Sequence, residues 1–289
     1  MRVSGKLTLV GTPLGNLGDL TDRARETLAA ADLVLCEDTR RTGGLMSKLG
    51  FTGTRMLVAN EHTEHSVIDR MLEAIAEGQN VVLATDAGMP AISDPGSRLI
   101  VAAADAGVEI DVAPGPTALI VALVLSGLPT DRFAFEGFLP RKGTERAGRL
   151  GDIARESRTV IVYEAPHRLV RTLEDLAAVC GKDRMASVAR ELTKMHQDVQ
   201  RGTLDSLHQH YFDVPPKGEF VIVVGPSSAE PSVRTDEELI VLLYAELNDG
   251  ASTRDAVALV STLTGEPKRR VYDLAIDLTK VLIEDDAEA

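Results

Sequence analysis

Apolar and polar positions along residues 6–113 alternate in a pattern that predicts strands joined by helices. Short runs rich in β-branched residues are separated by longer segments with helical periodicity. The expected strands are 6–10, 33–36, 55–59, 81–85 and 109–113, and the expected helices are 20–31, 42–49, 64–77 and 95–106. Nearly every strand position is apolar, which is typical of parallel strands covered by helices on both faces. We therefore predict an N-terminal α/β domain over residues 1–115.

Pro114-Gly115-Pro116 interrupts this pattern, and a second and looser α/β stretch follows. An Ala/Val/Leu-rich helix is expected over 117–125. The further expected elements are strands 133–138, 159–163, 184–190, 198–203 and 219–224, with helices 145–156 and 167–179. Having fewer helices between the strands favours a mixed sheet. We predict a second α/β domain over residues 116–226.

The C-terminal part has a different character. Residues 225–232 have the Gly/Pro/Ser composition of a linker, which we place at 227–234. Amphipathic helices are expected over 236–247, 252–263 and 267–282, with Ser252 as an N-cap and Pro267 in a first turn. Residues 235–289 thus predict a small helical module of helix-turn-helix size.

Composition narrows the protein class. The 289 residues are 44% hydrophobic, and the longest apolar run, 118–125, is far shorter than the roughly 20 residues that span a bilayer. The N-terminal apolar segment is too short for a signal-peptide core. We therefore expect a cytoplasmic protein, in which Cys36 and Cys180 are free thiols within apolar runs.

The distribution of charge matters more than its sum. The net charge is −13, but residues 235–289 contribute −8 of it, from five basic and thirteen acidic side chains. Residues 138–171 hold eight basic and four acidic side chains, a net of +4. An anionic partner can dock on this basic stretch, although a solvated helix face also explains it.

Glycine, proline and polar residues gather in the loops that follow the strands of the first domain. These loops are 11–19, 60–65, 85–96 and 113–118. Because ligands of open α/β sheets bind outside the carboxyl ends of the strands, we predict a cleft there. The loop 11–19 lacks the Gly-Lys-Ser/Thr of a P-loop and the GxGxxG spacing, which leaves a tight turn or a backbone-lined site for an uncharged or cationic ligand. Turn chemistry alone also explains Asp94-Pro95-Gly96.

Two other kinds of site are disfavoured. His62 and His65 lie three residues apart without a third ligand, so we predict no metal site. A serine-hydrolase elbow, Gly-x-Ser-x-Gly, is absent from the sequence.

These loops resemble the tetrapyrrole-methylase-like family of S-adenosylmethionine-dependent methyltransferases, and within it the bacterial branch that methylates a ribose of 16S ribosomal RNA. The resemblance covers about residues 6–225 and extends to the C-terminal helices. It rests on eight motifs in order: Gly-Thr-Pro-Leu-Gly-Asn-Leu-Gly-Asp (11–19), Glu-Asp-Thr-Arg (37–40), Asn-Glu-His (60–62), Ser-Asp-Pro-Gly (93–96), Gly-Phe-Leu-Pro (137–140), Tyr-Glu-Ala-Pro-His-Arg (163–168), Ala-Arg-Glu-Leu-Thr-Lys (189–194) and Lys-Gly-Glu-Phe (217–220).

The resemblance implies a two-domain α/β enzyme, a homodimer, that 2′-O-methylates a cytidine ribose in the decoding region of small-subunit rRNA. S-adenosylmethionine would lie in the cleft between the domains. The implied donor contacts are Leu14, Gly88, Met89, Ile92, Ser93, Thr117, Ala118, Tyr163, Leu192 and Gly218.

Methyl transfer to a 2′-hydroxyl depends mainly on alignment of the reacting atoms, helped by a base. Asp86 and Glu164 are among the acidic candidates at loop edges. We place Glu61 and Glu191 first, with Lys194 or Arg190 holding phosphate. Alternatively, Glu191 forms a salt bridge that only fixes its loop.

For RNA, the expected contacts are Arg141, Lys142, Arg146 and Arg168, because arginine forks onto phosphates. The acidic C-terminal module has one basic cluster, 268–270, and so is more suited to ribosome contact, dimerisation or packing than to reading duplex DNA. The alternative functions are tetrapyrrole C-methylation, and nucleic-acid binding by a regulator with a degenerate methyltransferase fold.

Overall fold

The computed structural model describes residues 5–60, 63–227, 235–248, 251–264 and 266–288. The chain forms two compact units, Met1–Ser228 and Ala229–Ala289. Among the described helices, none is both long enough and apolar enough to cross a membrane. The domain boundary predicted near residue 115 stays a prediction; it falls between the strands of two separate sheets within the first unit.

The first sheet is wholly parallel, with strand order β3-β2-β4-β1-β5. Every expected strand forms within one residue at each end, because a buried parallel strand needs an apolar run bounded by turns. Its strands are β1 (Leu7–Val10), β2 (Leu33–Cys36), β3 (Arg55–Val58), β4 (Val81–Ala84) and β5 (Ile110–Ala113).

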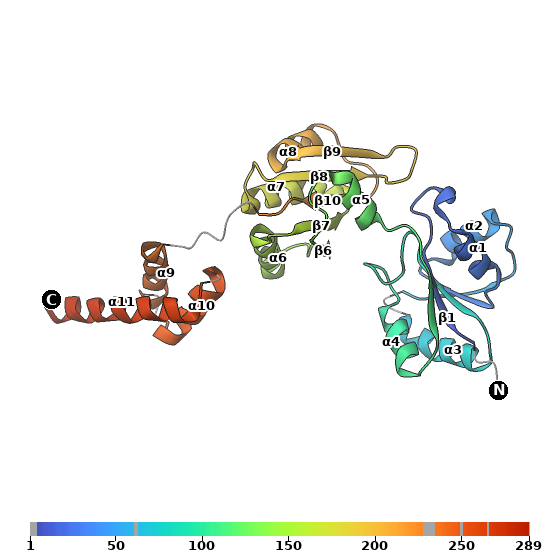
Figure 1. Ribbon diagram of the computed structural model, residues 1–289, viewed down its shortest axis with the longest axis horizontal. Helices are drawn as coiled ribbons and strands as arrows, with labels where there is room; N and C mark the ends of the chain where they lie inside the picture. Colours follow the sequence, from blue (N-terminus) through green and yellow to red (C-terminus); the bar gives the residue numbers. More distant parts are fainter. Residues whose placement is uncertain (1–4, 61–62, 228–234, 249–250, 265, 289) are drawn as a thin grey trace. The chain divides into compact units, whose positions relative to one another are not determined.

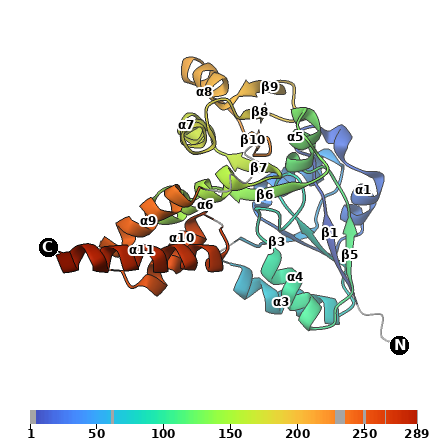
Figure 2. The same ribbon diagram turned by 60° about the vertical axis from the view of Figure 1, so that its left-hand side comes forward.

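Helices cover both faces of this sheet (Figures 1 and 2). On one face, α3 (Glu64–Ala76) and α4 (Ser97–Asp105) pack on a core that includes Leu7, Leu35 and Leu83. On the other, α1 (Asp22–Ala29) and α2 (Thr39–Lys48) pack on Val10, Val34 and Val82. A short 3₁₀ turn, η1 (Leu17–Asp19), precedes α1. The α/β class predicted from the alternating pattern is confirmed.

The second sheet is mixed, as predicted, with order β6-β7-β10-β8-β9. β6 and β7 are parallel, and the other neighbours are antiparallel. The strands are β6 (Phe133–Phe138), β7 (Thr159–Glu164), β8 (Met185–Arg190), β9 (Asp198–Thr203) and β10 (Phe220–Val224).

Three of the described helices pack on one face of the second sheet and one helix packs on the other (Figure 1). α6 (Gly143–Arg155), α7 (Leu169–Cys180) and α8 (Leu204–Asp213) share the larger core on one face, and η2 (Pro166–Arg168) leads into α7. On the other face α5 (Ala118–Ser126) packs against Ile161 and Val223 in a core that also includes Leu14 of the first sheet's loop. This face of the second sheet therefore borders the space between the two sheets.

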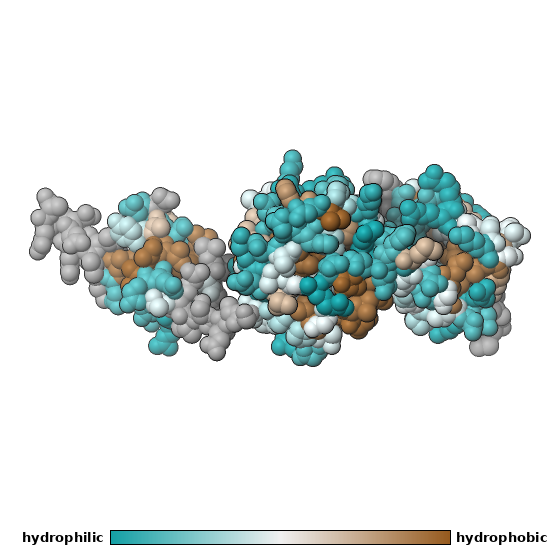
Figure 3. All heavy atoms as spheres, turned by 90° about the horizontal axis from the view of Figure 1, so that it is seen from above, coloured by the Kyte–Doolittle hydropathy of each residue, from teal (hydrophilic) through white to brown (hydrophobic). Residues whose placement is uncertain are grey.

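The C-terminal unit has its own small core. α9 (Asp236–Asn248), α10 (Thr253–Thr264) and α11 (Lys268–Glu288) bury Leu239, Leu243, Val260, Val271 and Ala275 among themselves. The three helices predicted from amphipathic periodicity are all present. In the first unit, the visible surface is mostly hydrophilic with scattered groups of apolar side chains (Figure 3).

The position of Arg146 contradicts a prediction made from the sequence. It was predicted to face RNA, but only 4% of it is exposed. Its guanidinium donates to Asp175 Oδ2 at 2.7 Å, to the Thr172 hydroxyl at 3.0 Å and to the Pro140 carbonyl at 2.9 Å. Arg146 lies four and seven residues before Leu150 and Ile153, on the buried face of α6. It ties α6 to α7 and is not a phosphate contact.

We expect Arg146→Ala to destabilise the first unit by about 3–5 kcal/mol, because it removes the hydrogen bonds of a buried guanidinium to Asp175, Thr172 and Pro140 and leaves a cavity in its place. Arg155→Ala is the matched control, since Arg155 ends the same helix and pairs with Asp152 on the surface; its loss is expected to stay below about 1 kcal/mol. Urea unfolding of both variants measures this. Equal midpoints for the two would contradict the structural role of Arg146.

Candidate active site

The carboxyl ends of β1 and β4 form the switch point of the first sheet. These strands are neighbours, yet the helices that follow them, α1 and α4, pack on opposite faces. Their loops therefore diverge and leave a crevice, which is where open α/β sheets bind ligands. Thr12 and Gly88 bridge the two loops by a pair of backbone hydrogen bonds of 2.9 and 3.1 Å.

Backbone also crosses backbone between the loops after β1 and β5. A Cβ on Gly11 would lie 2.5 Å from the Gly115 nitrogen and 2.7 Å from the Met89 sulfur, and a Cβ on Gly115 would lie 2.8 Å from Gly11 Cα. No side chain fits at either position. The three loops are therefore held in direct contact, and their next residues share one wall.

That wall belongs to a cavity of about 930 Å³ between the two sheets of the first unit. Nine of the ten residues expected to contact the donor line it: Leu14, Gly88, Met89, Ile92, Ser93, Thr117, Ala118, Tyr163 and Leu192. Gly218 does not; it lies in a turn with φ of +96° packed against Glu191. The strand-end cleft predicted from the loops is thus present, while the roles of these residues stay predictions.

One end of the cavity is largely apolar. Leu14, Ile92 and Phe138 line it together with Tyr163, whose ring packs edge-on against Phe138 at 5.6 Å. The Tyr163 hydroxyl accepts a 3.1 Å hydrogen bond from the Leu119 N–H at the start of α5. Burial raises the pKa of Tyr163 to about 12, so its hydroxyl stays neutral. Tyr163 thus fixes the α5 terminus against the second sheet.

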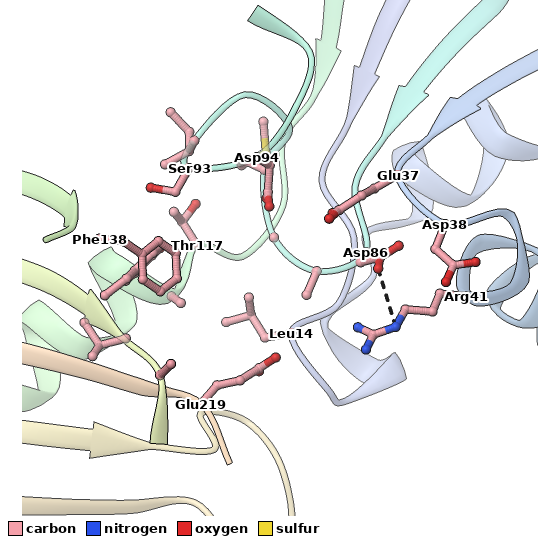
Figure 4. A pocket seen from close by; sticks show the side chains of 18 of the residues that line it. Leu14, Glu37, Asp38, Arg41, Asp86, Ser93, Asp94, Thr117, Phe138 and Glu219 are labelled. Carbon is pink, nitrogen blue, oxygen red and sulfur yellow. Dashed lines mark ion pairs between the residues drawn. The ribbon is translucent and has the colours of Figure 1, made fainter. Parts of the chain in front are cut away.

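The other end is charged, and Figure 4 shows Glu37, Asp38, Asp86 and Arg41 there, across Leu14 from Phe138 and Thr117. Asp38 caps α2 by accepting from the Arg40 N–H at 2.8 Å, so α2 begins at Thr39, three residues before the predicted start. The hydrogen bonds from Arg40 hold the pKa of Asp38 at about 2. Arg41 reaches Asp86, with Nε 3.4 Å from Oδ2.

Three carboxyls in this cavity have raised pKa values. Burial raises the pKa of Asp86, and the charge of Asp38 adds to the effect against Arg41. Burial also raises the pKa of Glu37 and Asp94, and in both the charge of Asp86 adds to it. The Asp86 Oδ1 atom is buried and has no hydrogen-bond partner among the described residues. Among the described residues, no group of three or more His, Cys, Asp or Glu side chains is arranged to hold a metal ion.

The residues expected to be catalytic lie differently from one another. Glu61 falls outside the described residues. Lys194 Nζ is 3.0 Å from both Glu191 Oε1 and Glu219 Oε2, and Glu191 Oε1 also accepts from the Glu219 N–H. Glu219 lines the cavity, whereas Glu191 and Lys194 stand behind it. This matches the alternative in which Glu191 fixes its loop by a salt bridge.

This ion-pair cluster joins the two halves of the first unit. Glu191 and Thr193 have φ of +50° and +62°, a conformation that costs free energy in residues other than glycine. The stem of Lys194 crosses Gly15, where a Cβ would lie 2.2 Å from Lys194 Cγ. Although burial alone would raise the pKa of Glu191, the hydrogen bond from Lys194 lowers it overall.

The residues expected to contact RNA also differ from one another in their exposure. Arg141 and Lys142 are exposed at the start of α6. Arg168 is partly buried: it donates to the Leu139 carbonyl at 2.6 Å, and its Nε is 3.2 Å from Glu164. The sequence gives no role to Glu37, Asp38 or Arg41, although the first two belong to the motif 37–40. Their position directly after a buried strand was the available signal.

Comparison with known proteins identifies the family. The model for tetrapyrrole (corrin/porphyrin) methylases matches residues 6–208, and one for an RsmI C-terminal HTH domain matches 236–279. Ribosomal RNA small subunit methyltransferase I of Synechocystis sp. is 44% identical, covering 95% of this chain and 98% of that protein. The protein of that name from Escherichia coli O157:H7 is 40% identical, covering 94% and 95%. The chain belongs to the ribosomal RNA small subunit methyltransferase I family.

Solved structures agree on the fold of this methyltransferase I family member. The methyltransferase CobJ has a TM-score of 0.60 at 24% identity, covering 78% of this chain and 95% of its own. Uroporphyrin-III C-methyltransferase from Thermus thermophilus, complexed with S-adenosylhomocysteine, has a TM-score of 0.54 at 21% identity, covering 76% and 97%. The tetrapyrrole-methylase-like fold expected from the motifs is confirmed.

We expect Lys194→Gln to raise the pKa of Glu191 toward its ordinary value of 4.5, because the hydrogen bond and charge that favour the carboxylate are lost. A carboxyl with a lowered pKa stabilises the fold above its ordinary pKa, and this contribution disappears as the pH falls. The variant should therefore melt below wild type at pH 7, and the difference should shrink on acidification.

Carbon-detected NMR titration of the Glu191 carboxyl and melting curves from pH 3 to 8 measure both effects. Lys182→Gln is the control, since Lys182 pairs with Asp205 on the surface. An unchanged Glu191 titration in Lys194→Gln would contradict the assigned ion pair.

Proposed function

We propose that this protein transfers the methyl group of S-adenosylmethionine to the ribose 2′-hydroxyl of a cytidine in the decoding region of 16S rRNA. The observation that carries the proposal is a cavity with one apolar and one charged end, in a chain whose relatives are named small-subunit rRNA methyltransferases over nearly their full length. The donor supplies an electrophilic methyl carbon on a positively charged sulfur. The protein has to bind and align the two substrates and to accept the proton of the hydroxyl.

The cavity fits a cationic donor. Its described lining has six carboxylates, Glu37, Asp38, Asp86, Asp94, Glu164 and Glu219, against two guanidiniums, Arg40 and Arg41. Such a surface favours a sulfonium over an anion. The Gly11–Gly115 crossing lets main chain, rather than side chains, form the wall. We place the donor at the apolar end, between Leu14, Thr117 and Tyr163.

The remaining space suits the acceptor sugar. Cavities for small molecules measure roughly 300–1,000 Å³, so 930 Å³ has room for the donor and one nucleoside together. Arg40 and Arg41 stand at the charged end with 88% and 68% of their side chains exposed. We place a phosphate of the RNA against these guanidiniums, which leaves the ribose facing Asp86.

We assign Asp86 as the base that accepts the proton of the 2′-hydroxyl. In the transfer, the 2′-oxygen bonds to the methyl carbon, the carbon–sulfur bond breaks with its electron pair left on sulfur, and the hydroxyl proton goes to a base. Asp86 Oδ1 is buried without a partner among the described residues, and burial raises its pKa. Both properties suit a proton acceptor. Glu191 is less suited because it does not line the cavity, and its Oε1 atom accepts from both Lys194 and the Glu219 N–H.

The two alternative functions have less support. Tetrapyrrole substrates carry many carboxylates, which the acidic lining would repel, and the cobalt precorrin-4 methyltransferase CbiF, whose fold is similar, shares 21% identity with this chain. A regulator with a degenerate fold would not need a complete cavity at the switch point. Two finer expectations accompany the main proposal: the protein acts in the cytoplasm, and it acts as a homodimer, for which the exposed Ile120 and Val124 of α5 offer an apolar face.

The proposed reaction is tested with unmodified small ribosomal subunits and S-adenosylmethionine labelled in its methyl group. Because a 2′-O-methyl blocks cleavage of the neighbouring phosphodiester by alkali, we expect label in an alkali-resistant dinucleotide whose first nucleoside is cytidine. Label in mononucleotides would move the reaction to a base. Absence of label despite measured donor binding would contradict an rRNA substrate.

We expect Asp86→Asn to lower kcat by about 10²-fold or more while the donor Kd changes little, since the amide keeps the shape but accepts no proton. The wild-type rate should rise with pH as Asp86 ionises, with a midpoint above the ordinary Asp value of 3.8. Single-turnover methylation from pH 4 to 8 measures this.

Folding is checked separately. A raised pKa means that the folded state disfavours the charge of Asp86, so removing the charge should not lower the Tm at pH 7. Asp105→Asn, exposed at the end of α4, is the surface control. An Asp86→Asn enzyme with wild-type kcat, or loss of kcat in Glu37→Gln alone, would reassign the base.

A further inference from the structure

The C-terminal unit has a surface hollow of about 380 Å³ between α10 and the beginning of α11. Arg254, Val257 and Ala258 of α10 line it, together with Lys268, Arg269 and Tyr272 of α11. The apolar part of its floor continues into the core of the unit, where Val257 is buried. This hollow is far in sequence from every residue of the methyl-transfer cavity, and nothing in the proposed reaction uses it.

Positive charge is concentrated at this hollow although the unit is acidic. Residues 235–289 contain five basic and thirteen acidic residues, and three of the five basic residues line the hollow. A fourth, Arg270, is neutralised by Asp236 at 2.7 Å and Glu266 at 2.8 Å. In the described part of the unit, Arg254, Lys268 and Arg269 have no ion-pair partner. Among the described residues of this unit, the hollow is therefore a face that attracts anions.

Helix electrostatics lead to the same conclusion. Lys268 and Arg269 occupy the first turn of α11, which contains no acidic residue. The N-terminus of a helix carries a partial positive charge, so cations there are locally unfavourable and anions favourable. Two unpaired cations at this position are explained by an external anion that interacts with both the side chains and the helix terminus.

An aromatic side chain distinguishes between classes of anion. Tyr272 is 50% exposed and lies four and three residues after Lys268 and Arg269, on the same face of α11. A flat ring beside forked guanidinium groups can stack on a base while the cations hold the adjoining phosphates. An acidic protein surface would use the cations but leave the ring unused.

We propose that this hollow binds phosphates and a neighbouring base of the rRNA, at a place outside the segment that enters the methyl-transfer cavity. The inference rests on the proposed function, since it takes the same RNA as ligand. The methyltransferase I relative from Thermotoga maritima, 43% identical, has 98% of its length matched by only 76% of this chain. That relative is thus matched by only part of this chain, and we assign the hollow to affinity rather than to chemistry.

The test compares full-length variants in binding to a 16S rRNA fragment and in methylation of small subunits. For Arg254→Ala/Lys268→Ala/Arg269→Ala we expect RNA affinity to fall tenfold or more, and KM to rise in parallel, with kcat within twofold of wild type. Three lost phosphate contacts should reduce the slope of log Kd against log salt by about 2–3. Tyr272→Ala should weaken binding severalfold, while Tyr272→Phe, which keeps the ring, should bind as wild type.

The matched control is Arg25→Ala/Lys48→Ala/Arg55→Ala, which removes three exposed cations from the first unit; melting curves verify folding of all variants. The inference is overturned if the hollow variant keeps its affinity and salt slope, if the control loses as much, or if duplex DNA or an acidic peptide competes as well as RNA. If wild type methylates subunits and only these results fail, the proposed function stands without the inference. If wild type neither methylates nor binds rRNA, the proposed function itself fails.

Discussion

The site depends on a contact between backbones that side chains would prevent. Gly11 and Gly115 follow the neighbouring strands β1 and β5, and each leaves no room for a Cβ on the other. Thr12 and Gly88 add a hydrogen-bonded bridge between the loops after β1 and β4. Because three strand ends are fixed at van der Waals distance, Leu14, Met89 and Thr117 converge on one wall without any covalent or ionic link between them.

The opposite wall is positioned by polar contacts instead. Buried Arg146 joins α6 to α7 through Asp175 and Thr172. Thr172 in turn donates to Glu164 Oε2 at 2.6 Å, and Glu164 is 2% exposed at the cavity. Such a network has geometric requirements that apolar packing lacks, so it fixes the end of β7 and with it Tyr163. A rigid wall suits a reaction whose barrier depends on alignment of three atoms.

The features that can be predicted from the sequence are those that depend only on residues close together in the chain. Apolar runs bounded by turn residues are local, so every strand was placed within one residue, and glycine-rich strand ends pointed to the cavity. The direction in which a helix side chain points is not local, and linear charge counting placed Arg146 at the RNA. Its spacing to Leu150 and Ile153 showed the buried face, but the charge outweighed that signal. Likewise the sequence gives no role to Glu37 and Asp38, because only the fold shows that the carboxyl ends of β2 and β4 meet in one cavity.

The two units illustrate how an acidic protein can handle RNA. The net acidity of the cavity suits the cationic donor but opposes the polyanionic acceptor, so Arg40 and Arg41 need further attraction for RNA from outside the cavity. Contacts far from the reacting atoms can supply binding energy that offsets the cost of bringing a phosphodiester to such a site. These contacts must not hold the reacting atoms themselves more tightly before the reaction than in the transition state. Exposed Arg141 and Lys142 on the first unit and the basic hollow on the second both meet this condition, because neither lines the cavity. Separating attraction from chemistry lets the cavity keep the charge that the donor requires.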